Sequence, residues 1–262
     1  MLREALGIVA TSVALAPSLV AARLADAATR GALGIPGALA ALGIAERPRD
    51  VIALTGGRSS AVYELRFARA TLVLKHALEG GSVLARGARR CGPQPYPADL
   101  SPEARVAREA AALDRLAGAG VRAPRVIAAN PAAAVLLLEH VAGVPLPATL
   151  ASSGAPTRIA AYRDALDAAH AAGLVLNDAH PGNALVEGDR IALIDLEFAE
   201  LSTNADRRAF DLAYAASYLT AAERRVFLRD ELDLRVAAAA RRLAGFAPLF
   251  AYESARQRKV AS

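Results

Sequence analysis

After residue 50, apolar residues come in short runs of the length expected for strands. Val51 to Leu54, Ala61 to Phe67 and Thr71 to His76 follow one another closely, with turn-forming residues between them. Val126 to Ala128 and Val135 to Leu138 are two further runs of this kind. The pattern predicts a small antiparallel sheet in the first half of the chain.

Between these two groups of strands the periodicity changes to that of a helix. Ser101 is a good capping residue, and Pro102 and Glu103 suit the first turn. The apolar positions that follow recur at helical spacing, and Glu109 falls on the same stripe. A carboxylate on an apolar stripe requires a partner.

The second half of the chain is richer in helical patterns. Thr157 to Ala172 is predicted to be helical, and the chain from Arg207 onward is helical almost to its end. Ala184 to Val186 and Ile191 to Ile194 form a predicted hairpin about Gly188. A strand-rich half followed by a helix-rich half predicts an α+β protein of two lobes with a cleft between them.

The first 45 residues have a different, strongly apolar character. Residues 5–22 carry no charge, and a second apolar stretch covers 31–45. Three interpretations remain open. The segment is a short membrane span interrupted by Pro17, a signal peptide in which Glu4 cancels Arg3, or Ala-rich helices that pack on the body or lie on a bilayer surface.

Composition narrows the class of protein without fixing its ligand. The chain has 262 residues, a formal charge of +5 and a pI near 9.8, which permit phosphate-bearing, lipid or nucleic-acid partners. The arginines are dispersed and no aromatic platform accompanies them, so nucleic acid is the weakest of these. A single cysteine, Cys91, excludes an intramolecular disulfide and a multi-cysteine metal site.

Arginine supplies nearly all of the positive charge. Lysine occurs only at Lys75 and Lys259, so in this arginine-rich chain each of the two is a candidate for a specific role. The Gly/Pro-rich stretch from Leu78 to Leu100 contains several arginines and is predicted to be a long irregular loop.

The hairpin in the second half brings three polar residues together. Asn183 immediately precedes its first strand and Asp195 immediately follows its second, so both lie at its open end. An amide oxygen beside a carboxylate is a site suited to Mg²⁺. Asp178, in the loop ahead of Asn183, is then placed to orient or deprotonate an incoming hydroxyl. The alternative is a solvated Asn/Asp/Gly loop.

The first half offers groups suited to a nucleotide. Gly56 and Gly57 stand between two strands, where backbone N–H groups can approach phosphates closely. Ser59 and Ser60 add hydroxyl donors. An ordinary Gly-Gly turn is the alternative interpretation.

Lys75 ends an apolar strand and directs a charge out of the sheet. A lysine that protects an exposed sheet edge from aggregation is one interpretation. A buried lysine and a buried glutamate nevertheless make most sense as partners, which favours a pair between Lys75 and Glu109. Such a pair would hold Lys75 for the phosphates.

Six runs of the sequence stand out together: Thr55 to Tyr63, Leu72 to Lys75, Arg108 to Ala110, Val135 to Glu139, Asn177 to Asn183 and Leu193 to Asp195. They resemble the aminoglycoside phosphotransferases and related members of the protein-kinase-like superfamily. The resemblance covers about 51–218, and it extends to choline kinases, lipopolysaccharide kinases and compact RIO-type kinases.

The resemblance implies a two-lobed protein-kinase-like fold. Its small antiparallel-sheet N-lobe would cover about 47–140 and its compact, mainly helical C-lobe about 141–262, with apolar N-terminal helices in residues 1–46. It also implies ATP and Mg²⁺ as cofactors. The protein would be cytoplasmic. If residues 1–46 contact a membrane, the protein would lie at the inner face of the cell membrane.

The resemblance also assigns roles to residues. Asp178 would be the catalytic base, and Lys75, held by Glu109, would contact the α- and β-phosphates. The remaining roles are those of Asn183 and Asp195 as Mg²⁺ ligands, Gly56, Gly57, Ser59 and Ser60 as phosphate contacts, Glu139 and Val141 as backbone partners of adenine, and Asp211 as a brace for the catalytic loop.

By this resemblance the chain would transfer the γ-phosphate of ATP to a hydroxyl group. Only about fifty residues follow Asp211, which leaves little of the helical subdomain that encloses small substrates in relatives. The reduced subdomain favours a large or membrane-bound acceptor, so of the two expected acceptors, a small molecule or a glycolipid, the sequence favours the glycolipid hydroxyl. Two alternatives stay open: a RIO-like Ser/Thr protein kinase, and a non-catalytic binding module, since Leu176 stands where many relatives have histidine.

Overall fold

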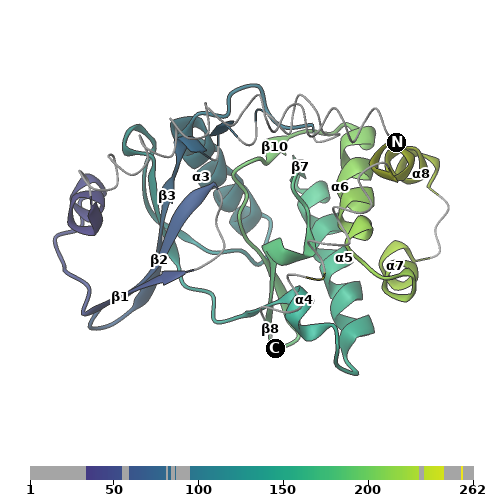
Figure 1. The fold of residues 1–262 in the computed structure, drawn as a ribbon, viewed down its shortest axis with the longest axis horizontal. Helices are drawn as coiled ribbons and strands as arrows, with labels where there is room; N and C mark the ends of the chain where they lie inside the picture. Colours follow the sequence, from purple (N-terminus) through teal and green to yellow (C-terminus); the bar gives the residue numbers. More distant parts are fainter. Residues whose placement is uncertain are drawn as a thin grey trace. The chain divides into compact units, whose positions relative to one another are not determined.

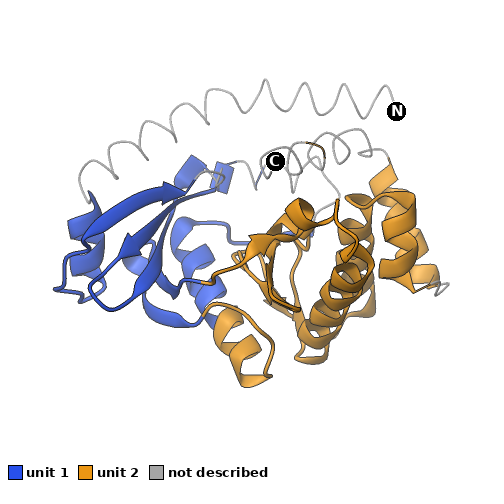
Figure 2. Cartoon of the chain, turned by 90° about the horizontal axis from the view of Figure 1, so that it is seen from below, with its two compact units in different colours: residues 1–111, 125–140 blue, residues 112–124, 141–262 orange. Residues whose placement is uncertain are grey.

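The computed structural model of the chain describes residues 34–54, 59–80, 82–83, 86, 95–229, 233–244 and 255. Two compact units divide the chain. The first consists of residues 1–111 and 125–140, and the second of residues 112–124 and 141–262 (Figure 2). The two units are described separately below.

The first unit is built on a five-stranded antiparallel sheet with the strand order β1-β2-β3-β5-β4 (Figure 1). β3 is therefore flanked on both sides by β2 and β5. The sheet and the helices of the second unit confirm the α+β class predicted from the sequence. The strands are β1 (Asp50–Leu54), β2 (Ser60–Arg66), β3 (Thr71–Ala77), β4 (Val126–Asn130) and β5 (Val135–Glu139).

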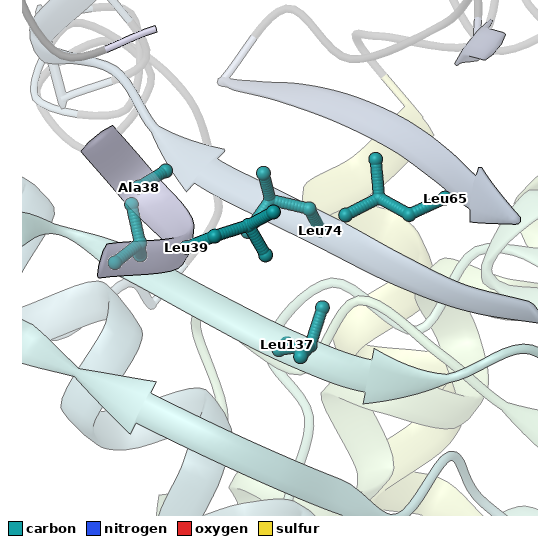
Figure 3. Close-up of a cluster of buried hydrophobic side chains, with 6 residues drawn as sticks. Ala38, Leu39, Leu65, Leu74 and Leu137 are labelled. Atoms are coloured by element: carbon teal, nitrogen blue, oxygen red, sulfur yellow. The ribbon is translucent and has the colours of Figure 1, made fainter. Parts of the chain in front are cut away.

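A short helix at residues 34–41 completes the core of this sheet. Its Ala38 and Leu39 are buried and join the same cluster as three leucines of β2, β3 and β5, all of which are 3% exposed or less (Figure 3). Asn130 adds a polar contact, because its Nδ2 donates to the carbonyl of Ala41 at 2.8 Å. This part of the apolar N-terminal stretch thus packs on the sheet.

The remainder of the apolar stretch, residues 1–33, lies outside the described residues, and so do the membrane interpretations that concern it. Among the described helices, none is both long and apolar enough to cross a membrane.

The second unit contains two small sheets, of order β6-β8-β9 and β10-β7, and most of the helices (Figure 1). The predicted hairpin is present as β8 and β9, with Gly188 at a φ of +65° in its turn. The strands are β6 (Val144–Pro145), β7 (Leu174–Val175), β8 (Ala184–Glu187), β9 (Arg190–Leu193) and β10 (Glu200–Leu201), and the helices are α4 (Leu146–Thr149), α5 (Ala155–Ala171), α6 (Ala205–Ser217), α7 (Ala221–Leu228) and α8 (Leu234–Leu243).

The helical C-terminal part is divided more finely than its periodicity predicted. Asn204 caps α6, and Thr220 caps α7 through a capping box with Glu223. Arg229 then takes a left-handed conformation with φ +56°, and Asp233 caps α8. These capping residues end and restart the helix where the apolar pattern alone runs on.

The helix predicted from Ser101 is α3 (Pro102–Gly118). The stretch before it is more regular than expected, since the described residues 79–80, 82–83 and 86 are helical rather than irregular. The backbone N–H of Ser82 donates to Leu78 at 3.4 Å, a bond of helical spacing. The prediction of an irregular loop is thus wrong for these residues, whereas the described residues 95–100 are irregular as predicted.

Candidate active site

Lys75 and Glu109 meet inside the first unit. Lys75 Nζ lies 2.6 Å from Glu109 Oε2, and the two side chains are 7% and 2% exposed. Lys75 stands opposite Val62 of β2 and Leu136 of β5, so its strand is interior to the sheet. The edge-protection interpretation of Lys75 is therefore wrong.

A buried arginine, which the sequence did not single out, ties three segments of this unit together. Arg105 of α3 is fully buried, and its guanidinium donates to the carbonyls of Ser59 at 2.7 Å and Leu78 at 2.9 Å. It also contacts the hydroxyls of Ser60 and Ser82 at 3.2 and 3.3 Å. In a chain with so many arginines, nothing in the local pattern marks this one.

The predicted phosphate contacts are only partly described. Gly56 and Gly57 lie outside the described residues. Ser59 uses its carbonyl on Arg105, and Ser60 is 3% exposed with its hydroxyl on the same guanidinium. Within the unit, both serines are therefore bound to Arg105.

Glu139 and Val141, the predicted adenine contacts, belong to different units. The backbone N–H of Glu139 donates to the carbonyl of Arg125 at 2.9 Å. The carbonyl of Val141, a buried residue, accepts from the N–H of Gly143 at 2.9 Å. One backbone group of each residue is thus already used within its own unit.

In the second unit, Asp211 of α6 holds the loop that carries Asp178. Asp211 is fully buried, and its carboxylate accepts the backbone N–H groups of Leu176 and Asn177 at 2.7 and 2.8 Å. His170 of α5 contacts the same carboxylate at 3.0 Å. Three bonds fix this side chain, as the expected brace requires.

Asn177 takes a strained conformation that these contacts stabilise. Its φ is +61°, in the left-handed region that asparagine tolerates better than most residues. Its Nδ2 donates to the carbonyl of Phe198 at 2.7 Å, and its Oδ1 accepts from Arg207 at 3.0 Å. These contacts fix the backbone directly before Asp178.

Asp178, Asn183 and Asp195 lie together at the open end of the hairpin. The Asn183 side-chain amide donates to the carbonyl of Asp178 at 3.1 Å, and the Asn183 carbonyl accepts the N–H of Ile194 at 2.9 Å. Asp195 follows with φ +60°. The two bonds join the loop of Asp178 to the hairpin.

The environment of Asp178 alters its acidity. Burial raises the pKa of this carboxyl from 3.8 to about 6; the nearby His180 and a hydrogen bond from Tyr214 oppose the rise, and the negative charges of Asp195 and Glu197 add to it. A carboxylate with a pKa near 6 is ionised at neutral pH and is still a better proton acceptor than an ordinary aspartate.

The same residues are suited to a hard cation. Because Asn183 directs its amide nitrogen at the loop, its Oδ1 is the atom left for a ligand. Asp195 is close enough for its charge to raise the pKa of Asp178. An amide oxygen and a carboxylate are the ligands that Mg²⁺ accepts.

A group of aromatic residues supports the loop from α6. The ring centroids of His180 and Tyr218 are 5.6 Å apart, and the hydroxyl oxygens of Tyr218 and Tyr214 are 3.0 Å apart. Tyr162 of α5 donates to the carbonyl of Ala179 at 3.0 Å. His180 accepts the N–H of Gly182 on Nδ1, in line with the structural role expected for it.

Comparison with known proteins points to one family. Residues 147–246 match the model of a family described as "Phosphotransferase enzyme family". The matched segment contains the loop of Asp178, the hairpin with Asn183 and Asp195, and the bracing Asp211. The resemblance drawn from the sequence is thus confirmed over this part of the chain.

The chain also matches solved structures at low identity. One is described as WaaP in complex with acyl carrier protein, with 17% identity over 79% of this chain and 89% of that chain and a TM-score of 0.47. Another is a complex of Rv3197 and erythromycin from Mycobacterium tuberculosis, with 17% identity over 78% of this chain and 74% of that chain and a TM-score of 0.44. No curated protein matches the chain.

Proposed function

We propose that this chain is a kinase that moves the γ-phosphate of ATP to a hydroxyl group of a small molecule or glycolipid. The observation that carries the proposal is the loop of Asp178, two backbone N–H groups of which are held by the Asp211 carboxylate, close to Asn183 and Asp195. The match of residues 147–246 to a phosphotransferase family supports it.

In this proposal Asp178 acts as the general base. The acceptor hydroxyl gives its proton to the Asp178 carboxylate while its oxygen forms a bond to the γ-phosphorus. The bond from that phosphorus to the bridging oxygen breaks, and ADP leaves. A pKa near 6 keeps Asp178 ionised at neutral pH and ready to accept the proton.

The remaining residues position the nucleotide. Lys75, fixed by its 2.6 Å contact with Glu109, is the proposed partner of the phosphates. Asn183 and Asp195 would hold Mg²⁺, which when bound offsets the negative charge of the phosphates.

The first test is nucleotide binding by the full chain. Mg²⁺ and ATP together should raise its melting temperature, and Asp178→Asn should keep that shift while losing turnover. Asp189→Asn is the matched control, because Asp189 is an exposed carboxylate in the turn of the same hairpin. A wild-type protein that shows no shift with Mg²⁺-ATP would contradict the proposal.

The acceptor class is proposed from the resemblance of the sequence to aminoglycoside, choline and lipopolysaccharide kinases. Labelled ATP should transfer its γ-phosphate to a lipid extract or to an aqueous metabolite extract of the source cells. Transfer to protein alone would exclude the small-molecule and glycolipid acceptors. Because residues 34–41 pack on the sheet, membrane contact is proposed for residues 1–33 only.

A further inference from the structure

The side chain of Asn177 binds two neighbouring segments of the second unit. Its Nδ2 donates to the carbonyl of Phe198 at 2.7 Å and to Glu200 Oε2 at 3.2 Å. Its Oδ1 accepts from Nη2 of Arg207, in the first turn of α6, at 3.0 Å. The nitrogen thus faces two acceptors and the oxygen faces a donor, so these partners fix the orientation of the amide.

Glu200 and Arg207 also bind each other. Glu200 Oε2 and Arg207 Nη2 form an ion pair, and these are the same two atoms that bind the Asn177 amide. The Asn177 side chain is fully buried, whereas those of Glu200 and Arg207 are 35% and 31% exposed. Each of the three side chains therefore contacts the other two, and we call them the Asn177 network.

One end of the network is the loop of Asp178. Asn177 directly precedes Asp178 and has a φ of +61°. Its backbone N–H donates to Asp211 at 2.8 Å, so both its backbone and its side chain are held. Because the peptide bond that follows is planar, a fixed Asn177 restricts the position of the Asp178 backbone.

The other end of the network is the turn that begins at Asp195. The φ of Asp195 is +60°, and the N–H of Ala199 donates to the carbonyl of Leu196 at 3.0 Å. Phe198, whose carbonyl accepts from Asn177, lies inside this turn and is 6% exposed. A displacement of Phe198 would therefore also displace Asp195, three residues before it.

The small sheet of β7 and β10 joins the same two segments farther from the site. Its pairs are Val175 with Glu200 and Leu174 with Leu201, so the ladder ends two residues before Asn177. The bond from Asn177 to Phe198 continues the connection beyond the ladder, toward Asp178 and Asp195.

We propose that Arg207, paired with Glu200, is a positioning residue for phosphoryl transfer that acts through Asn177 to hold Asp178 at a set position relative to Asp195. The inference rests on the proposed function, in which Asp178 is the base and Asp195 a metal ligand. In this role Arg207 binds no substrate. Its loss should therefore lower kcat and leave the KM for ATP nearly unchanged.

The test is steady-state hydrolysis of Mg²⁺-ATP by the full chain, with water as the acceptor and phosphate release as the signal. Asn177→Gly is the sharpest variant, because glycine adopts the left-handed conformation without strain and removes only the side-chain bonds. Asn177→Gly and Arg207→Met should each lower kcat by at least about tenfold, with a KM for ATP within about threefold of wild type. The double variant should be at most about twofold slower than either single variant, because both changes remove the same network.

Two further variants separate this role from a general loss of stability. Arg207→Lys keeps the charge and a donor for Asn177, so its kcat should be at least about threefold higher than that of Arg207→Met. Arg225→Met makes the same change in charge at an exposed arginine of α7 and should alter kcat by less than about twofold. Circular dichroism verifies folding of each variant.

Hydrogen exchange of the ligand-free chain tests the network without turnover. The amides of Leu176 and Asn177, which donate to Asp211, should exchange at least about fivefold faster in Asn177→Gly and Arg207→Met than in wild type or Arg225→Met. A wild type that neither binds nor hydrolyses Mg²⁺-ATP rejects the proposed kinase, and faster exchange in the two variants then still supports the hold of Arg207 on the loop. Unchanged exchange with unchanged kcat, or additive losses in the double variant, overturns the role of Arg207.

Discussion

Replacing Lys75 by methionine should destabilise the first unit strongly, and a second replacement at Glu109 should restore most of the loss. Met keeps the length and volume of the lysine stem and removes only the charge. The Glu109 side chain is only 2% exposed, and in this variant it would lose the Lys75 ammonium group that lies 2.6 Å from its carboxylate. Breaking a buried pair in this way typically costs about 3–5 kcal/mol.

Protonation of Glu109 limits this loss of unfolding free energy. A stranded carboxylate can escape by taking up a proton, and protonating an ordinary glutamate at pH 7 costs about 3.7 kcal/mol. We therefore expect Lys75→Met to lose about 3–4 kcal/mol at pH 7, falling by up to about 1.4 kcal/mol for each pH unit below it. In Lys75→Met/Glu109→Leu no charge is stranded, and the loss should fall to about 1 kcal/mol or less.

Urea unfolding followed by circular dichroism at pH 5.5 and pH 7 measures these free energies. The exposed pair between Arg66 and Glu64 is the control, since Arg66→Met should cost at most about 1 kcal/mol at either pH. Additive effects of Lys75→Met and Glu109→Leu, or single losses no larger than that of the control, would refute the reasoning from burial.

Three further changes have definite expected outcomes. Asp211→Ala removes the acceptor of two backbone N–H bonds and should cost about 2–5 kcal/mol in unfolding experiments, with loss of phosphoryl transfer. The pKa of Asp178 is raised from 3.8 to about 6, so its ionisation destabilises the ligand-free fold as pH rises through that interval; Asp178→Asn should therefore add about 3 kcal/mol above pH 7 and only about 0.5 kcal/mol near pH 4, measured as melting temperature against pH. Gly143→Ala should be destabilising by about 1–3 kcal/mol because its Cβ would lie 2.8 Å from Leu185 Cβ, whereas Gly118→Ala meets no atom within 4 Å and serves as its control.

Much of the fold was predictable because its elements are local patterns. The strands of the first sheet follow apolar runs bounded by turn residues, and Val51 to Leu54 differs from β1 by a single residue. The helical end of the chain was predicted less well. Its division into α6, α7 and α8 depends on capping bonds such as that of Thr220, which periodicity does not report.

The candidate site divides in the same way. The hairpin predicted Asn183 and Asp195 as neighbours from its connectivity alone, and the bond from Ile194 to Asn183 joins those positions. Their roles as metal ligands stay a prediction, as does that of Asp178. The sequence suggested Lys75 and Glu109 as partners only because two buried charges in a small unit need each other.

The sequence by itself determined the antiparallel strands, the hairpin and the residues that resemble a phosphotransferase site, because these depend on periodicity and on spacing along the chain. The tertiary structure decided which charges are buried and what they meet. Arg105 reaches Ser59 across 46 positions, and Asp211 reaches Leu176 across 35. The electrostatic energy of a charged side chain depends on the groups around it. The local sequence does not report those groups, so arginines that look alike in the sequence are distinguished only by the fold.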